Sequence, residues 1–259
     1  NDTVLRDLTR RSPLKELNYR YVMTDSPDLR GIDVALLYQR DLFKLLSSRS
    51  IPIPPLGQYR QTRDLLHVSG LLLTGDTLDV FVCHLPSRSG GAKESEPYRL
   101  YAAQILRTEV DHILNIRSHP QVIIMGDFND YPTAEAPPIT APTPASTLNS
   151  TNPSTIVPSS LKLYHLLARK AKSPNFGSYK YRGEWGLLDH LIVSGTLLNQ
   201  SSHFFTSEER ANVCLLPFLL KDDEKYGDKE PFRTYKGMKY QGGISDHLPV
   251  YADFELIPY

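Results

Sequence analysis

The chain has 259 residues, of which 40% are hydrophobic and 22% are charged. This composition excludes an intrinsically disordered chain, because it supplies enough apolar material for a substantial core. The 29 basic residues equal the 29 acidic ones, so no overall positive field would attract nucleic acid or an anionic membrane. No apolar run approaches the roughly 20 residues that cross a bilayer, so we expect a soluble protein.

The first half of the chain is rich in predicted strands. Residues 2–10 favour a helix, because Asp2 or Thr3 can cap it and apolar residues recur on one side. The turn at residues 74–77 predicts a hairpin between the two strands that flank it. The expected strands cover residues 19–23, 32–38, 65–73 and 78–85.

A long helix and a buried strand are predicted next. Pro97 suits a helix start, and the apolar spacing after it predicts a helix through Ser118. Residues 122–125 form a continuous apolar run that Gly126 ends, which is typical of a strand buried on both faces. Later elements are a short helix at residues 161–170 and strands at residues 187–193, 203–206 and 250–256.

Residues 132–158 contain seven prolines among Thr, Ser, Ala and Asn, a composition that resists regular structure. Because core-like segments lie on both sides, we interpret residues 132–160 as a surface loop within one domain that spans residues 1–259. Strands outnumber helices, and a long helix leads directly into a buried strand. This order predicts two packed sheets with helices outside them.

The segment after the buried strand carries the first candidate site residues. In an extended chain, residues two apart face the same way, so Asp127 and Asn129 would project together while Phe128 points into the core. An ordinary Asp/Asn turn after a strand is the alternative.

A second group of candidates comes from two Asp-His dipeptides, at residues 189–190 and 246–247. Asp189 lies in an otherwise apolar strand, where a carboxylate is costly unless it is paired. An aspartate that fixes the tautomer of a histidine meets this need, and we expect Asp189 to pair with His247. Asp246, the residue before His247, could bind a cation. His190, on the opposite face of the strand, is expected to be a core or edge histidine.

Three further residues each have a functional and a structural interpretation. His84 ends a strand and could reach a cleft at the end of the sheet, although a packed histidine is the commoner case. Arg63 could bind the phosphate of a substrate or form a surface salt bridge. Trp185 could form a wall of the substrate pocket or pack in the core.

Together, four motifs resemble the endonuclease/exonuclease/phosphatase family, the superfamily of deoxyribonuclease I. They occur in the family's order as His-Leu-Pro at residues 84–86, Gly-Asp-Phe-Asn at residues 126–129, Leu-Asp-His-Leu-Ile-Val-Ser at residues 188–194 and Ser-Asp-His-Leu-Pro-Val at residues 245–250. Each motif alone is weakly specific, whereas the ordered set is specific and spans about residues 30 to 255. The resemblance implies a four-layered α/β/β/α sandwich and divalent-metal hydrolysis of phosphate esters.

The resemblance also implies a role for each matching position. Asp246 resembles the metal ligand, and His247 resembles the histidine that contacts the scissile phosphate. Asp189 matches the carboxylate partner of that histidine. Asp127 and Asn129 match the pair that handles the attacking water and the phosphate oxygens, and His84 matches the histidine near the leaving group. The implied cofactor is Mg²⁺, with Mn²⁺ possible, and the implied partner is a phosphate ester: nucleic acid, phosphoinositide or phospholipid headgroup.

One departure from the family pattern supports a different interpretation. Family members have an N-terminal strand with an Asn and a later strand with a metal-binding Glu, and neither has a counterpart here. We therefore expect this chain to lack the first ~40 to 60 residues, the usual length of two strands and a connecting helix. A catalytically impaired binding module of the same fold is the alternative function. We expect a monomer, and the sequence does not distinguish a cytoplasmic from a secreted or periplasmic compartment.

Overall fold

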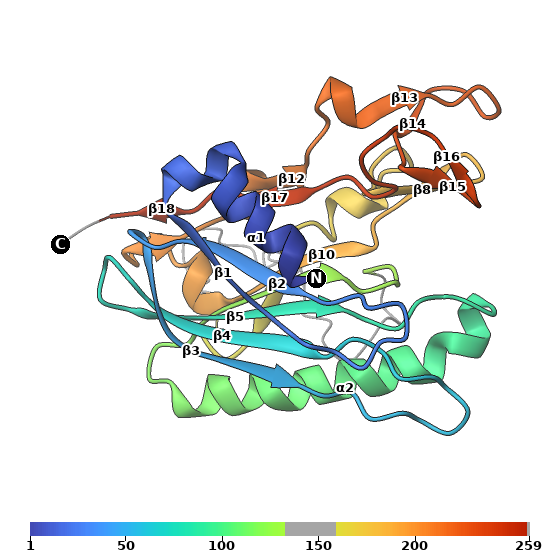
Figure 1. The fold of residues 1–259 in the computed structure, drawn as a ribbon. Coiled ribbons are helices and arrows are strands. Elements are labelled where there is room, and N and C mark those ends of the chain that lie inside the picture. The colour runs from blue at the N-terminus through green and yellow to red at the C-terminus, as the bar shows by residue number, and fades with distance from the viewer. Residues whose placement is uncertain (133–158, 258–259) are drawn as a thin grey trace, which may run out of the picture.

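The computed structural model describes residues 1–132 and 159–257 (Figure 1). Its centre is a six-stranded mixed sheet in which the strand order is β3-β4-β5-β6-β10-β7. The pair β5–β6 is parallel, and the other neighbours are antiparallel. In that order the strands are β3 (Phe43–Ile51), β4 (Leu65–Leu72), β5 (Thr77–His84), β6 (Gln121–Asp127), β10 (Asp189–Ser194) and β7 (Leu163–His165).

The long helix α2 (Ala92–Ile116) covers one face of this sheet (Figure 1). Its apolar side, which includes Leu106 and Val110, packs on Phe81 and Ile124 to form one of the two core clusters. The helix begins at Ala92, so the prediction that it starts at Pro97 was wrong. Pro97 therefore lies inside the helix, where its missing N–H deprives the Lys93 carbonyl of its usual intrahelical donor, and Arg99 Nη2 donates to the neighbouring Ala92 carbonyl at 2.8 Å.

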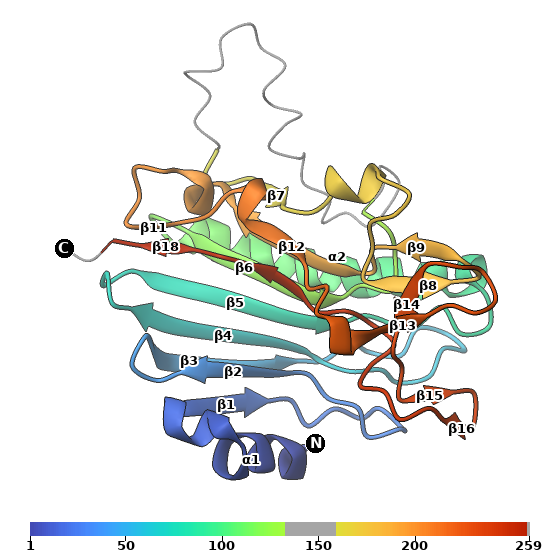
Figure 2. The ribbon, with the colours of Figure 1, turned by 90° about the horizontal axis from the view of Figure 1, so that it is seen from above.

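A second layer of strand pairs packs on the opposite face (Figure 2). Leu66, Val68 and Val80 of the central sheet contribute to the second core cluster, together with Val213 and Leu248 from this layer. Helix α1 (Asp2–Arg11) lies outside the layer against β1, which completes an α/β/β/α sandwich. The pairs are β1 (Tyr19–Met23) with β2 (Ala35–Gln39), β12 (Ala211–Val213) with β17 (Val250–Ala252), and β11 (Phe204–Phe205) with β18 (Glu255–Leu256).

Three small hairpins gather at the end of the molecule where β5 leads into α2 (Figures 1 and 2). They are β8 (Tyr179–Tyr181) with β9 (Glu184–Gly186), β13 (Leu220–Asp222) with β14 (Lys229–Pro231), and β15 (Tyr235–Lys236) with β16 (Lys239–Tyr240). Short 3₁₀ helices occupy Pro13–Leu17, Lys170–Lys172, Gly195–Leu198, Glu208–Arg210 and Pro217–Leu219. Within residues 1–132 and 159–257, no helix is long and apolar enough to cross a bilayer.

Most of the predicted strands are present, with three differences. The helix predicted at residues 161–170 was wrong, because Leu163–His165 form β7 and pair with β10 at the edge of the sheet. Strand β3 was not predicted, since its Ser-rich exposed face resembles a loop. The strand predicted at residues 250–256 is divided into β17 and β18. The predicted Pro-rich loop at residues 132–160 lies almost entirely outside the described residues.

Candidate active site

The register of three neighbouring strands places three predicted site residues in one row. His84, the last residue of β5, lies opposite Asp127, the last residue of β6. Asp127 in turn lies opposite Asp189, the first residue of β10. Because the carboxyl ends of β5 and β6 meet at the same edge and β10 runs in the opposite direction, all three side chains lie at one end of the sheet.

Gly126 allows this row to form. It lies opposite Cys83 in the parallel pair and has a φ of +133°, a conformation that L side chains rarely adopt. A Cβ atom at this position would lie 1.9 Å from the Cys83 carbonyl oxygen, so only glycine fits. The glycine is therefore needed for the close approach of β5 and β6 just before Asp127.

The turn after β6 fixes the carboxylate of Asp127. The Asn129 backbone N–H donates to Asp127 Oδ1 at 2.7 Å, and Asn129 Nδ2 donates to the Leu85 carbonyl at 3.1 Å. Asn129 has a φ of +51°, so the segment is a turn and not the extended chain that the sequence predicted. Phe128 points into the core as predicted, where its ring stacks on that of His190 at 4.5 Å.

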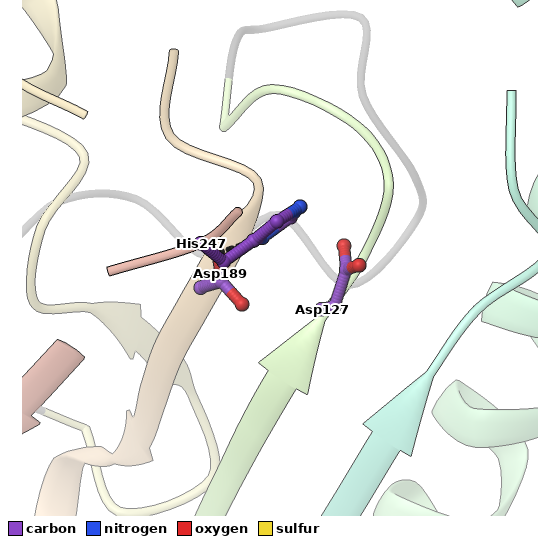
Figure 3. Close-up of side chains that lie close together, drawn as sticks. All are labelled: Asp127, Asp189 and His247. Atoms are coloured by element: carbon purple, nitrogen blue, oxygen red, sulfur yellow. Dashed lines mark hydrogen bonds and ion pairs between the residues drawn. The ribbon is translucent and has the colours of Figure 1, made fainter. Parts of the chain in front are cut away.

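The predicted pairing of Asp189 with His247 is present (Figure 3). His247 Nδ1 lies 2.7 Å from Asp189 Oδ2, and the same oxygen accepts a 2.5 Å hydrogen bond from Ser178 Oγ. A bridge between Tyr179 and His247 brings the residues before β17 to this position. The imidazole ring projects toward the side on which Asp127 lies. Its Nδ1 is thereby held, which leaves Nε2 for a substrate.

Burial and neighbouring charges shift the pKa values of the histidines in opposite directions. Burial acts against the imidazolium of His247, but the hydrogen bond and charge of Asp189 outweigh it, so the pKa of His247 is raised. Burial, followed by the charges of Arg63 and Arg30, lowers the pKa of His84 to about 3. His84 is therefore neutral near pH 7, and its Nε2 lies 3.5 Å from Asp127 Oδ2 without a full ion pair.

The carboxylates of the row repel each other. Burial first and the charge of Asp189 second raise the pKa of Asp127 to about 6. A bound cation would relieve this repulsion, and carboxylate oxygens are the ligands that Mg²⁺ prefers. Ligand atoms of Asp127, Asp189 and His247 lie within 4.8 Å of one another, the only such group of three or more among the residues described. These donors fit a divalent cation.

The remaining predicted residues surround this group. Asp246, the predicted metal ligand, lies next to His247 but is exposed and outside the group of three. Arg63 is only 2% exposed, so the salt bridge predicted as the alternative is present but is buried and does not lie at the surface. It lies 3.4 Å from Asp28 and donates to the Leu85 carbonyl at 2.7 Å. Trp185, on β9, is half-buried and packs against the core between the two β layers.

Sequence analysis did not identify two residues that support His247. Ser178 is fully buried and donates to Asp189, and the ring of Tyr179 lies 4.9 Å from the His247 ring. Neither residue carries a sequence signal, because Ser and Tyr before a short strand are common.

Comparisons with solved structures give the same fold. *D. rerio* TDP2 complexed with a single-strand DNA product has a TM-score of 0.55 at 15% identity, with 98% of this chain and 82% of that chain covered. The human Nocturnin catalytic domain with a bound sulfate anion has a TM-score of 0.54 at 19% identity, with 93% and 73% covered. An endonuclease/exonuclease/phosphatase family protein from *Bacteroides thetaiotaomicron* has a TM-score of 0.55 at 16% identity, with 95% and 75% covered.

At these identities the structural likeness establishes the fold. No curated protein sequence matches the chain. A model of the endonuclease/exonuclease/phosphatase family matches residues 1–256, nearly the whole sequence. The chain therefore belongs to the endonuclease/exonuclease/phosphatase family.

Proposed function

We propose that the protein is a divalent-metal-dependent hydrolase of phosphate esters. The observation that carries this proposal is the row of His84, Asp127 and Asp189 at one end of the sheet, with His247 hydrogen-bonded to Asp189. Hydrolysis needs an oriented water, stabilisation of charge on the phosphoryl oxygens and help for the departing oxygen. The row and His247 supply a candidate group for each need.

Asp127 is the proposed acceptor of a proton from the attacking water. Its raised pKa, about 6, brings it closer to the working pH of a general base than an ordinary carboxylate. Asn129 holds this carboxylate through its backbone N–H. On the other side, Asp189 orients His247 and stabilises its protonated form, so that Nε2 can donate to a phosphoryl oxygen.

His84 and Asp246 complete the proposed site. Neutral His84 lies on the β5 side of Asp127, where we place the leaving group. The exposed Asp246 is the proposed ligand of the cation, for which Mg²⁺ is the first candidate and Mn²⁺ the second. When bound, the cation would neutralise charge on the phosphoryl oxygens. Arg63 and Trp185 remain proposed substrate-binding residues.

The substrate is an anionic ester. *D. rerio* TDP2 was solved with a DNA product and human Nocturnin with sulfate, which supports a site for a tetrahedral oxyanion in this fold. Nucleic acid, phosphoinositide and phospholipid headgroup are all compatible with the proposal. We propose that the protein acts as a monomer.

The test is hydrolysis of bis(p-nitrophenyl) phosphate with Mg²⁺, with Mn²⁺ and with a chelator. We expect metal-dependent turnover that His247→Asn lowers by about 10³-fold, within the usual range for a catalytic acid or base. His119→Asn is the matched control, because His119 is an exposed histidine in the turn after α2. If no metal supports turnover while phosphate still binds, the chain is the impaired binding module.

A further inference from the structure

A polar cavity lies beside the row of His84, Asp127 and Asp189. Its volume is about 470 Å³, and its wall is formed by the segment around Arg63, the loop after β5 and the start of α2. The Leu85 carbonyl connects it to the proposed active site. That oxygen accepts from Asn129 Nδ2 at 3.1 Å and from Arg63 Nη2 at 2.7 Å, so the two regions share one backbone group immediately after His84.

The cavity is positively charged. Arg30, Arg60 and Arg63 line it, and Asp28 is the single carboxylate among its lining residues. Asp28 lies 3.5 Å from Arg30 and 3.4 Å from Arg63, so one acid serves two guanidinium groups. The lining therefore carries two more positive than negative charges. Both Arg63 and Arg30 contribute to lowering the pKa of His84, which places their charge close to the row.

Three polar atoms in the wall of the cavity lack a hydrogen-bond partner among the residues described. They are Thr62 Oγ1, Arg63 Nε and Tyr98 OH, on side chains that are only 3%, 2% and 4% exposed. A buried polar group without a partner costs free energy, and native structures contain few of them. All three atoms belong to residues that line the cationic cavity, so the protein leaves donors beside the cavity unused.

We propose that this cavity binds a second phosphate group of the substrate, on the His84 side of the scissile ester. This inference rests on the proposed function. A phosphate carries negative charge, which complements the positive charge of the guanidinium groups. Its several oxygens can accept hydrogen bonds from guanidinium and hydroxyl donors at the same time. A nucleotide chain with a neighbouring phosphate and a multiply phosphorylated small molecule share this chemistry.

A matched pair of nucleotides, assayed by the release of inorganic phosphate, tests the cavity. Thymidine 5′-phosphate and its 3′-phosphorylated form, thymidine 3′,5′-bisphosphate, differ only in the second phosphate, and the departing nucleoside carries that group. We expect kcat/KM to be at least about 10-fold higher for the 3′-phosphorylated form, an ordinary gain for one charge-assisted contact. A parallel arm compares inositol 1-phosphate with inositol 1,4-bisphosphate. Preference in only one arm identifies the source of the phosphate.

Substitutions of residues that line the cavity distinguish an effect on ligand binding from an effect on the stability of the fold. Arg60 is exposed, and Arg60→Gln should reduce the preference for the second phosphate to about 3-fold or less. Arg20→Gln removes the same charge from the exposed face of β1 and should leave the preference unchanged. Tyr98→Phe removes a buried hydroxyl that lacks a partner, so it should reduce the preference without lowering the Tm.

The outcomes distinguish the two proposals. Turnover of the singly phosphorylated substrate with no preference for the second phosphate overturns the cavity proposal and leaves the proposed function intact. If no substrate is hydrolysed, calorimetric titration with thymidine 3′,5′-bisphosphate and thymidine 5′-phosphate still tests the cavity. Equal Kd values, or an Arg20→Gln effect as large as that of Arg60→Gln, would overturn it.

Discussion

The hydrogen-bonded pair of Asp189 and His247 is open to the proposed active site, whereas the hydrogen-bonded pair of Asp79 and His67 is closed within the protein. Asp189 and His247 meet at 2.7 Å at the end of the strands, where both side chains are partly exposed. Asp79 and His67 meet at 2.9 Å between the sheet and α2, where Asp79 is fully buried. Ser69 also donates to Asp79, and Arg117 Nε donates at 2.9 Å.

The two pairs differ in whether donor or acceptor atoms are left free after the hydrogen bonds within the protein have formed. Burial disfavours the Asp79 carboxylate, but the hydrogen bonds from His67, Arg117 and Ser69 outweigh it and lower its pKa to about 2. These donors occupy both oxygens of the Asp79 carboxylate. The carboxylate therefore has a structural role in the protein interior. In the other pair the ring of His247 projects toward Asp127. An Asp–His pair thus serves stability or chemistry according to what its environment leaves free.

The largest expected effect concerns the open pair. Asp189→Asn should lower kcat by about 10³- to 10⁴-fold, because the amide no longer stabilises the imidazolium or fixes its tautomer. The measurement is metal-dependent hydrolysis of bis(p-nitrophenyl) phosphate, with the fold checked by circular dichroism. Asp189→Asn combined with His247→Asn should cost little more than the worse single variant, because the two act as a unit. Additive losses would contradict the pairing.

The closed pair should show the reverse pattern. Asp79→Asn should lower the free energy of unfolding by about 3 kcal/mol, because it leaves the buried network without its charge. Urea denaturation measures this loss. The kcat per folded molecule should stay near the wild-type value, since Asp79 lies several residues before His84 on β5. A drop in kcat comparable with that of Asp189→Asn would remove the distinction between the two pairs.

The closed pair should also affect the pH dependence of stability. The folded pKa of Asp79, about 2, is below the unfolded value of about 3.9, so its contribution is complete above pH 5. That contribution is lost as the pH falls through 4 toward 2, and it amounts to about 2 kcal/mol. Between pH 5 and 2 the wild type should therefore lose more stability than Asp79→Asn. Parallel curves for the two proteins would show that Asp79 is not selectively stabilised.

The same comparison shows what the sequence could predict. Asp189 and Asp79 both lie in apolar strands, so both carry the signal of a carboxylate that needs a partner. The partner of Asp189 was found because His247 belongs to a motif. The partners of Asp79 depend on the antiparallel register of β4 and β5, which places Ser69 opposite Asp79. Register follows from packing across whole strands, which the local pattern does not contain.

The smallest expected effect concerns His67. Its replacement by Gln should lower the free energy of unfolding by about 1 kcal/mol, because Asp79 keeps its hydrogen bonds from Ser69 and Arg117. Loss of ring stacking on Phe81, at 4.4 Å, contributes to this cost. The matched His247→Gln variant should change stability by less and lower kcat far more. Chemical denaturation and kinetics on both variants test the reciprocal pattern, and equal effects on kcat would place His67 in the same functional class as His247.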